Sequence, residues 1–191
     1  DCLASSDTAK AALELFKSEM GDIHIVAVII SHAHIDHYGG IQGVLTQDEL
    51  ADPSLSLDEQ IASGKTAIIV PDGFENAVMS ENVFVGTAMK RRSLYQYGSV
   101  IQPGEQGRLS VGIGLAVSQG EVGYLSPTFN VTEEVFETTI DGVKVIFQLT
   151  PDTESPAEMN TYFPDKKALW LAENCTASMH NIYTLRGAEV R

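Results

Sequence analysis

The stretch Ser31-His32-Ala33-His34-Ile35-Asp36-His37-Tyr38-Gly39-Gly40 holds three of the five histidines of the chain. It directly follows the apolar run of residues 23–30, which is rich in β-branched side chains. Such a run, bounded by polar residues and glycine, predicts a buried strand. The sequence therefore predicts a strand that ends in His-x-His-x-Asp-His and turns into a helix through the glycine pair.

Four donor side chains stand within six residues at this strand end, so they can converge on a small volume. Three imidazoles and a carboxylate suit zinc or a similar borderline metal. Alternation along an extended segment assigns His32 and His34 to one metal and leaves Asp36 and His37 for a second. The alternative is that these histidines are structural. We disfavour it because such a dense group at one strand end is not expected by chance.

His32, His34, Asp36 and His37 together resemble the signature motif of the metallo-β-lactamase superfamily. The resemblance implies an α/β fold, the αβ/βα sandwich, with a site for two metal ions. Members of the superfamily hydrolyse lactams, thioesters, lactones, phosphodiesters and sulfate esters, and some catalyse redox reactions. The motif alone therefore does not select a reaction.

The composition limits the class of protein. A chain of 191 residues with 43% hydrophobic and 20% charged residues is most simply one soluble globular domain. No apolar run approaches the roughly 20 residues that a membrane span needs. The net charge of −14 argues against nucleic acid as a partner and opposes any anionic substrate at long range. An anion would therefore need a local positive site.

The chain opens Asp1-Cys2-Leu3, without methionine or a basic start. We expect it to be a piece of a longer protein, in which a secretion signal could precede this segment. Two cysteines, Cys2 and Cys175, are too few for a disulfide framework, and we expect free thiols.

The remaining periodicity predicts further elements. A helix to Met20 follows possible N-caps at residues 5–7 and has an apolar face of Ala9, Leu13, Phe16 and Met20. The other expected elements are a short helix at 41–45, a loop or surface helix within 47–64, a buried strand at 66–70, helices within 74–97 broken near Gly86, hairpins at 135–140/143–149 and 160–163/168–172, and a final helix at 176–186. The glycine-rich stretch 98–123 predicts a binding or lid loop, with a disordered insertion as the alternative.

Two glutamates follow predicted strands and extend the candidate metal site. Glu154 lies just past the strand ending at 149, and Glu173 ends the strand that begins at 168. In the superfamily these places usually hold a histidine and a bridging aspartate. Glutamate at both, with the segments 157–160 and 183–188 after them, resembles the bacterial linear alkylsulfatases, which degrade dodecyl sulfate. Asp152 departs from this branch, which usually has glycine there.

The resemblance implies a ligand set. His32, His34 and Glu154 would hold one zinc, Asp36 and His37 a second, and Glu173 would bridge the two ions. Full-length relatives also carry upstream strands, a later histidine ligand, a dimerisation domain and a C-terminal lipid-carrier-like domain. We therefore expect 1–191 to be one partial catalytic domain, incomplete at both ends. His180 is expected to be structural or to contact a ligand, and His24 to lie in a strand.

The expected reaction is zinc-dependent hydrolysis of an alkyl sulfate to alcohol and inorganic sulfate, with hydroxide formed from water shared by the two ions. Asp36 would orient that hydroxide. By resemblance, Arg186 would bind the sulfate, since its donor fork matches paired oxygens. The alternative for Arg186 is a contact with the helix dipole. The loop 98–123 and Tyr95 or Tyr97 would border the alkyl chain.

Two alternatives stay open at this point. One is another hydrolase of the superfamily, acting on a lactone, thioester or phosphoester. The other is a non-catalytic fragment with an incomplete metal site. The resemblance further implies a homodimer in a periplasmic or secreted location. It leaves open the preference for primary or secondary esters, and whether the C–O or the S–O bond breaks.

Overall fold

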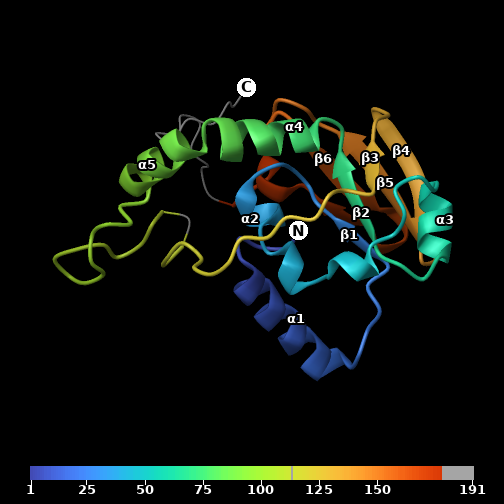
Figure 1. The fold of residues 1–191 in the computed structure, drawn as a ribbon, viewed down its shortest axis with the longest axis horizontal. Helices are drawn as coiled ribbons and strands as arrows, with labels where there is room; N and C mark the ends of the chain where they lie inside the picture. Colours follow the sequence, from blue (N-terminus) through green and yellow to red (C-terminus); the bar gives the residue numbers. More distant parts are fainter. Residues whose placement is uncertain (113, 178–191) are drawn as a thin grey trace.

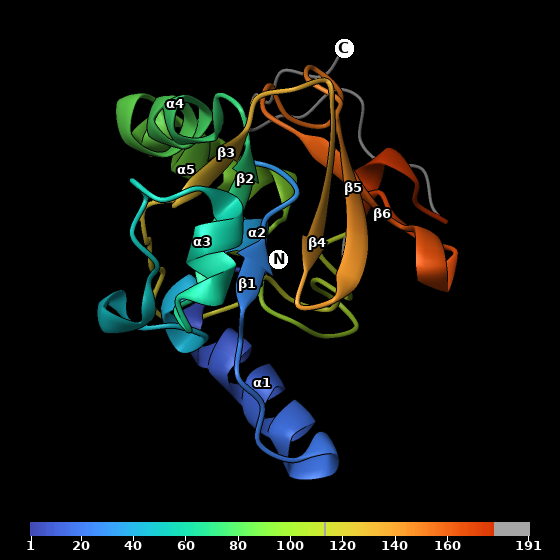
Figure 2. The ribbon, with the colours of Figure 1, turned by 90° about the vertical axis from the view of Figure 1, so that its right-hand side faces the viewer.

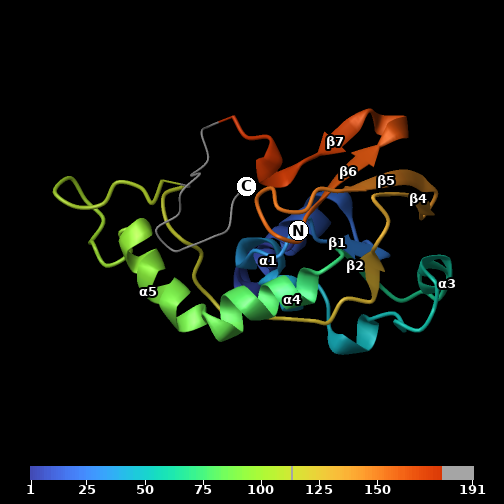
Figure 3. The ribbon, with the colours of Figure 1, turned by 90° about the horizontal axis from the view of Figure 1, so that it is seen from above.

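Two β-sheets pack face to face at the centre of the structure, and helices cover the outer side of one of them (Figures 1 and 2). The computed structural model describes residues 1–112 and 114–177. The layers are most distinct from above, where the second sheet lies on one side of β1 and β2 and helix α4 on the other (Figure 3). This arrangement agrees with the mixed α/β class that the sequence predicts.

The first sheet is parallel, in the order β1-β2-β3. Its strands are β1 (Ala27–Ile29), β2 (Ala67–Pro71) and β3 (Phe129–Val131). The prediction of a buried strand at 66–70 is confirmed by β2. The prediction of a strand over 23–30 is wrong in length, because pairing with β2 begins only at Ala27 opposite Ala67. The sequence does not predict β3, since three residues with Asn130 in the middle show no usable period.

The second sheet is antiparallel, in the order β4-β5-β6-β7. Its strands are β4 (Val135–Ile140), β5 (Val143–Leu149), β6 (Met159–Phe163) and β7 (Ala168–Trp170). The first hairpin is confirmed residue for residue, and the second differs only at its ends. Asp141 and Gly142 both have positive φ, at 47° and 77°, as a two-residue turn that matches the strand twist requires.

Apolar side chains fill both faces of the first sheet. Between the sheets, Ile69 and Val131 meet Val145, Phe147 and Met159. On the other face, Ile68 and Val70 pack with Phe74 of α4. Alternation along β2 sends successive side chains to opposite faces, so all five of its residues are buried.

The outer face of the second sheet is not covered by any helix within the described residues (Figure 2). Ile146, Tyr162 and Leu169 form a row across three strands there, since Tyr162 pairs with Ile146 on one side and with Leu169 on the other. Tyr162 and Leu169 are 37% and 56% exposed. This open face therefore carries an exposed apolar row, flanked by polar side chains such as Gln148 and Asn160.

Five α-helices and one π-helix lie within the described residues. They are α1 (Ser6–Met20), α2 (Ile35–Tyr38), α3 (Leu57–Ala62), α4 (Phe74–Met79), the π-helix η3 (Ser80–Phe84), and α5 (Gly86–Gln96). Short 3-10 turns add η1 (Ile41–Gly43), η2 (Gln47–Glu49), η4 (Pro164–Lys166) and η5 (Ala172–Asn174). The expected helix at 41–45 is thus a 3-10 turn, whereas the break near Gly86 is confirmed.

Helix α1 projects from the body of the structure (Figure 1). Ser5 caps it, accepting a hydrogen bond from the Thr8 amide. The predicted helix is confirmed, but most of its apolar face is not covered. Of that face only Ala9 is buried, while Phe16 and Met20 are 47% and 70% exposed, because the helix docks only through its first turns.

Those first turns pack closely on the glycines that follow the histidine motif. A β-carbon on Gly40 would collide with the Cys2 carbonyl oxygen, and one on Gly43 would collide with that of Ser6. Both positions therefore require glycine. The amide of Gly40 also donates to the Leu3 carbonyl, so the start of the chain is held against the motif.

The stretch 98–123 contains no helix or strand in its described part, as predicted for a loop. Its last residues are nevertheless anchored. The Glu121 amide donates to the Asp7 carboxylate, and the Gly123 amide donates to the Gly39 carbonyl. These contacts contradict a disordered insertion for this end of the loop and place it beside the histidine motif.

Both cysteines, Cys2 and Cys175, are free, as predicted, and Cys2 is buried. From residue 178 on, the predicted helix 176–186 lies outside the described residues, together with His180 and Arg186. Within the described part of the chain, each helix falls short of the length and apolar character that crossing a membrane demands.

We expect Phe147→Ala to lower the free energy of unfolding by about 3–5 kcal/mol, because Phe147 is fully buried between the sheets. Leu169→Ala, on the outer face of the second sheet, is the control, and we expect it to cost less than about 1 kcal/mol. Denaturant titration of both variants measures the difference. Equal losses would contradict a core between the two sheets.

Candidate metal centre

The histidine motif lies where the two sheets meet. His32 follows β1 and forms an isolated bridge with Glu158, and the Met159 amide donates to the Ser31 carbonyl. The segment that joins β5 to β6 therefore runs beside the motif, although the two are far apart in sequence. The residues after β7 reach the same edge, which brings Glu173 to it.

Two groups of donor atoms converge here. His32, His34 and Glu154 form the first, and His32, His37 and Glu173 form the second; within each group the ligand atoms lie within 4.8 Å of one another. His32 Nε2 is 3.0 Å from His34 Nδ1, which is 3.4 Å from Glu154 Oε1. His37 Nε2 is 2.9 Å from Glu173 Oε1. The two groups share His32, so they are two halves of one site.

Asp36 lies outside both groups. Its side chain is 56% exposed, and its Oδ2 is 3.7 Å from His37 Nε2. It therefore stands at the rim of the site, on the solvent side of the second group. Its part as a ligand stays a prediction, as does every other metal assignment.

Two residues that sequence reasoning did not single out support the imidazoles. Asp1 Oδ2 is 2.7 Å from His37 Nδ1, and Ser31 Oγ is 3.0 Å from His32 Nδ1. Ser31 also donates to the Asp1 carboxylate through its amide and its hydroxyl. An oxygen on one ring nitrogen fixes the tautomer and leaves the other nitrogen for a metal. The only signal in the sequence was the closeness of Ser31 to the motif.

Glu158 holds the loop that carries Glu154. Its Oε2 accepts a hydrogen bond from the Ser155 amide, while its buried Oε1 has no hydrogen-bond partner among the described residues. Burial raises the pKa of Glu158 despite the hydrogen bonds that it accepts. Asp152, two residues before Glu154, has φ of 61°, a left-handed conformation that aspartate tolerates better than most residues. The departure from glycine there is thus compatible with the turn.

A residue with positive φ also precedes Glu173. Ala172 before it has φ of 44°, an unusual conformation for a residue other than glycine and one that occurs at functional sites. Burial alone would raise the pKa of Glu173, but the hydrogen bond and charge of His37 outweigh it and lower the pKa. Glu173 is therefore held as a carboxylate.

The charges and one buried atom fit a metal. Five carboxylates (Asp1, Asp36, Glu81, Glu154 and Glu173) lie within 4.0 Å of three imidazoles. The cluster is therefore negative even with every imidazole protonated. Buried Glu173 Oε2 has no hydrogen-bond partner within the described part of the chain and lies 3.8 Å from His32 Nε2. Divalent cations would offset this charge and satisfy that oxygen.

Comparison with known proteins identifies the fold. Residues 1–50 match the family model of the Metallo-beta-lactamase superfamily. A solved structure, the stereoselective inverting sec-alkylsulfatase Pisa1 from Pseudomonas sp., matches all of this chain with a TM-score of 0.88 and 36% identity. Residues 1–50 are therefore similar to that superfamily, and the fold of the whole chain is similar to the matched part of the alkylsulfatase Pisa1.

The chain is similar to alkylsulfatases along its whole length. It is 41% identical over 191 residues to the alkyl/aryl-sulfatase BDS1 of Saccharomyces cerevisiae. It is 42% identical over 192 residues to a linear primary-alkylsulfatase of Pseudomonas sp.. The chain spans only 28% and 27% of these two curated relatives, and 28% of the Pisa1 chain. Metal binding is a property that the superfamily implies for this site.

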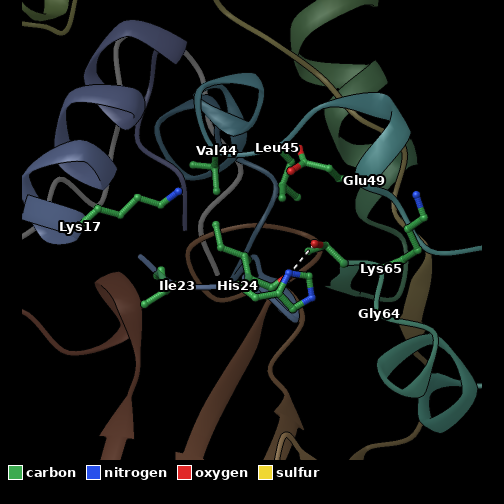
Figure 4. A pocket seen from close by; sticks show the side chains of 10 residues that line it. Lys17, Ile23, His24, Val44, Leu45, Glu49, Gly64 and Lys65 are labelled. Carbon is green, nitrogen blue, oxygen red and sulfur yellow. Dashed lines mark hydrogen bonds between the residues drawn. The ribbon is translucent and has the colours of Figure 1, made fainter. Parts of the chain in front are cut away.

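A hollow of about 190 Å³ lies at the other end of the first sheet (Figure 4). Lys17, His24 and Lys65 line it, together with Glu49. The prediction that His24 lies in a strand is wrong, because it precedes β1 and is exposed. This hollow lies before β1 and β2 begin, whereas the histidine motif follows β1, so it is separate from the metal site.

We expect Glu173→Gln to weaken zinc binding roughly 100-fold or more, because the amide removes the charge that faces His32 and His37. Glu134→Gln is the matched control, since Glu134 is exposed and belongs to neither donor group. Competition with a chromophoric chelator, in the full-length protein, measures both affinities. Unchanged affinity in Glu173→Gln would contradict its place in the site.

Proposed function

We propose that the protein containing this chain is a zinc-dependent alkylsulfatase that hydrolyses alkyl sulfate esters to an alcohol and inorganic sulfate. One water is consumed, the ester bond breaks, and the products are the alcohol and hydrogen sulfate. The observation that carries the proposal is the convergence of two donor groups on His32, with Glu154 in one and Glu173 in the other. The names of the relatives support the substrate class.

In this proposal His32, His34 and Glu154 would hold one zinc ion, Asp36 and His37 would hold a second, and Glu173 would be shared by both. Zinc bound in this way supplies a nucleophile from water near neutral pH and offsets the charge of the ester. Asp36 is exposed and at the rim, where its carboxylate can accept a proton from water and orient it. Asp1 and Ser31 keep the imidazoles of His37 and His32 in the required orientation.

Substrate recognition needs a cation and an apolar surface. We assign sulfate binding to Arg186 on the resemblance to alkylsulfatases, since a guanidinium pairs well with two sulfate oxygens. For the alkyl chain, the π-helix η3 is well placed. Glu81 on it is 3.6 Å from His34, and Val83 and Phe84 beside it are 59% and 81% exposed. Tyr95, on the helix α5 that follows η3, is 82% exposed and would extend this surface.

The quaternary structure and location follow from the same resemblance. We propose a homodimer in the periplasm or outside the cell. A yeast protein among the relatives has comparable identity, so the relatives alone do not restrict the family to bacteria.

The full-length protein should release sulfate from dodecyl sulfate, measured by ion chromatography. Lactone, thioester and phosphoester substrates are the comparison, and we expect little turnover of them. Faster turnover of one of these esters, with no sulfate released from alkyl sulfates, would overturn the proposed function.

Removing the metal should abolish this activity. We expect dialysis against a strong chelator to reduce sulfate release to background, and added zinc to restore it, because divalent cations offset the carboxylates of the cluster. Buffer without chelator is the control. Full activity in protein shown by elemental analysis to be free of metal would contradict the mechanism.

A further inference from the structure

The three imidazoles of the site share one arrangement. Each directs one ring nitrogen into the donor groups: Nε2 of His32, Nδ1 of His34 and Nε2 of His37. For His32 and His37 the opposite nitrogen faces an oxygen, from Ser31 and Asp1 respectively. The opposite nitrogen of His34 is Nε2, on the far side of the ring from Glu154 and His32.

Glu81 supplies the oxygen on that side. Its Oε2 lies 3.6 Å from His34 Nε2, and the side chains of Glu81 and His34 are only 22% and 6% exposed. This distance is that of an ion pair. It is longer than a hydrogen bond of about 3.0 Å, and a small rotation of the Glu81 side chain would close the difference. Glu81 faces Nε2 of His34, whereas His32 and Glu154 face Nδ1, so Glu81 lies on the outer side of the ring.

The backbone around Glu81 is unusual as well. It lies in the π-helix η3 (Ser80–Phe84), between α4 and α5. A π-turn inserts one residue into a helix and is frequent at functional sites, because it redirects a side chain that a regular helix would point elsewhere. Here the arm formed by α4, η3 and α5 places the Glu81 carboxylate against His34 and leaves Val83 and Phe84 of the same π-helix exposed.

We propose that Glu81 is a positioning residue for the metal centre: it accepts the Nε2 proton of His34 and so keeps Nδ1 as the ligand atom. A carboxylate in this place fixes the tautomer, raises the basicity of the imidazole and orients the ring. The inference rests on the metal site of the proposed function but not on its substrate. It assigns to each of the three imidazoles an oxygen partner from a different segment: residue 1, residue 31 and the π-helix.

The test compares Glu81→Gln with Glu105→Gln in the full-length protein. The glutamine that replaces Glu81 retains the shape of the side chain but lacks its charge, and Glu105 is an exposed carboxylate in the loop 98–123. We expect zinc affinity, measured by chelator competition, to fall roughly 10- to 100-fold in Glu81→Gln and to stay unchanged in Glu105→Gln. The stoichiometry at saturating zinc should remain that of the wild type.

A second readout separates positioning from a general structural role. With cobalt(II) in place of zinc, we expect the visible d–d absorption of Glu81→Gln to differ from that of the wild type, because the ring of His34 is no longer held in one orientation. The melting temperature of the metal-free protein should be the same for Glu81→Gln and the wild type.

Each other outcome is decisive. Wild-type affinity and an unchanged cobalt spectrum in Glu81→Gln would overturn the inference while leaving the proposed function intact. A lowered melting temperature of metal-free Glu81→Gln, with zinc affinity lost in proportion, would also overturn it in favour of a structural role. A wild-type protein that binds zinc but releases no sulfate would overturn the proposed function alone.

Discussion

Mutual repulsion among carboxylates is the constraint on which the site depends. Five of them surround three imidazoles at the junction of two sheets, and several are partly or fully buried. Such a cluster costs free energy unless cations neutralise it. Three local features hold the cluster together. Residues 152 and 172 have left-handed backbone conformations, buried Glu158 holds the loop that carries Glu154, and the π-helix η3 precedes α5. These features bring the two donor groups to one edge of the sheets, in an arrangement that could hold a metal ion.

Local patterns made part of this structure predictable. The hairpin of β4 and β5 follows from strict alternation around Asp141-Gly142, and α1 follows from Ser5 and a helical period. Each signal lies within one element. The length of β1 and the existence of β3 were missed, because both are decided by the neighbouring strand β2 and not by their own residues. The exposure of Phe16 and Met20 was missed for the same reason, since a period shows which residues share a face but not what covers it.

The residues of the candidate site likewise fall into two groups: those with a local sequence signal and those placed only by tertiary packing. His32, His34 and His37 could be recognised from their spacing, and Glu154 and Glu173 from their positions after strands together with a family resemblance. Asp1 and Glu81 gave no such signal. Neither belongs to a motif, and each reaches an imidazole only through the way distant segments pack. Residues that donate to a metal leave a trace in sequence because they cluster, whereas the residues that hold them in place are dispersed.

The geometry of the site also depends on two residues without side chains. Gly40 and Gly43 pack directly against the backbone at the start of the chain. A side chain at Gly40 has no room beside the Cys2 carbonyl, so it would displace the backbone that follows Asp1. The carboxylate on His37 would move with it. Gly40 thus affects the position of the carboxylate beside His37, although it has no polar side chain of its own. The position of the acidic group beside His37 is therefore determined in part by the lack of a side chain at residue 40.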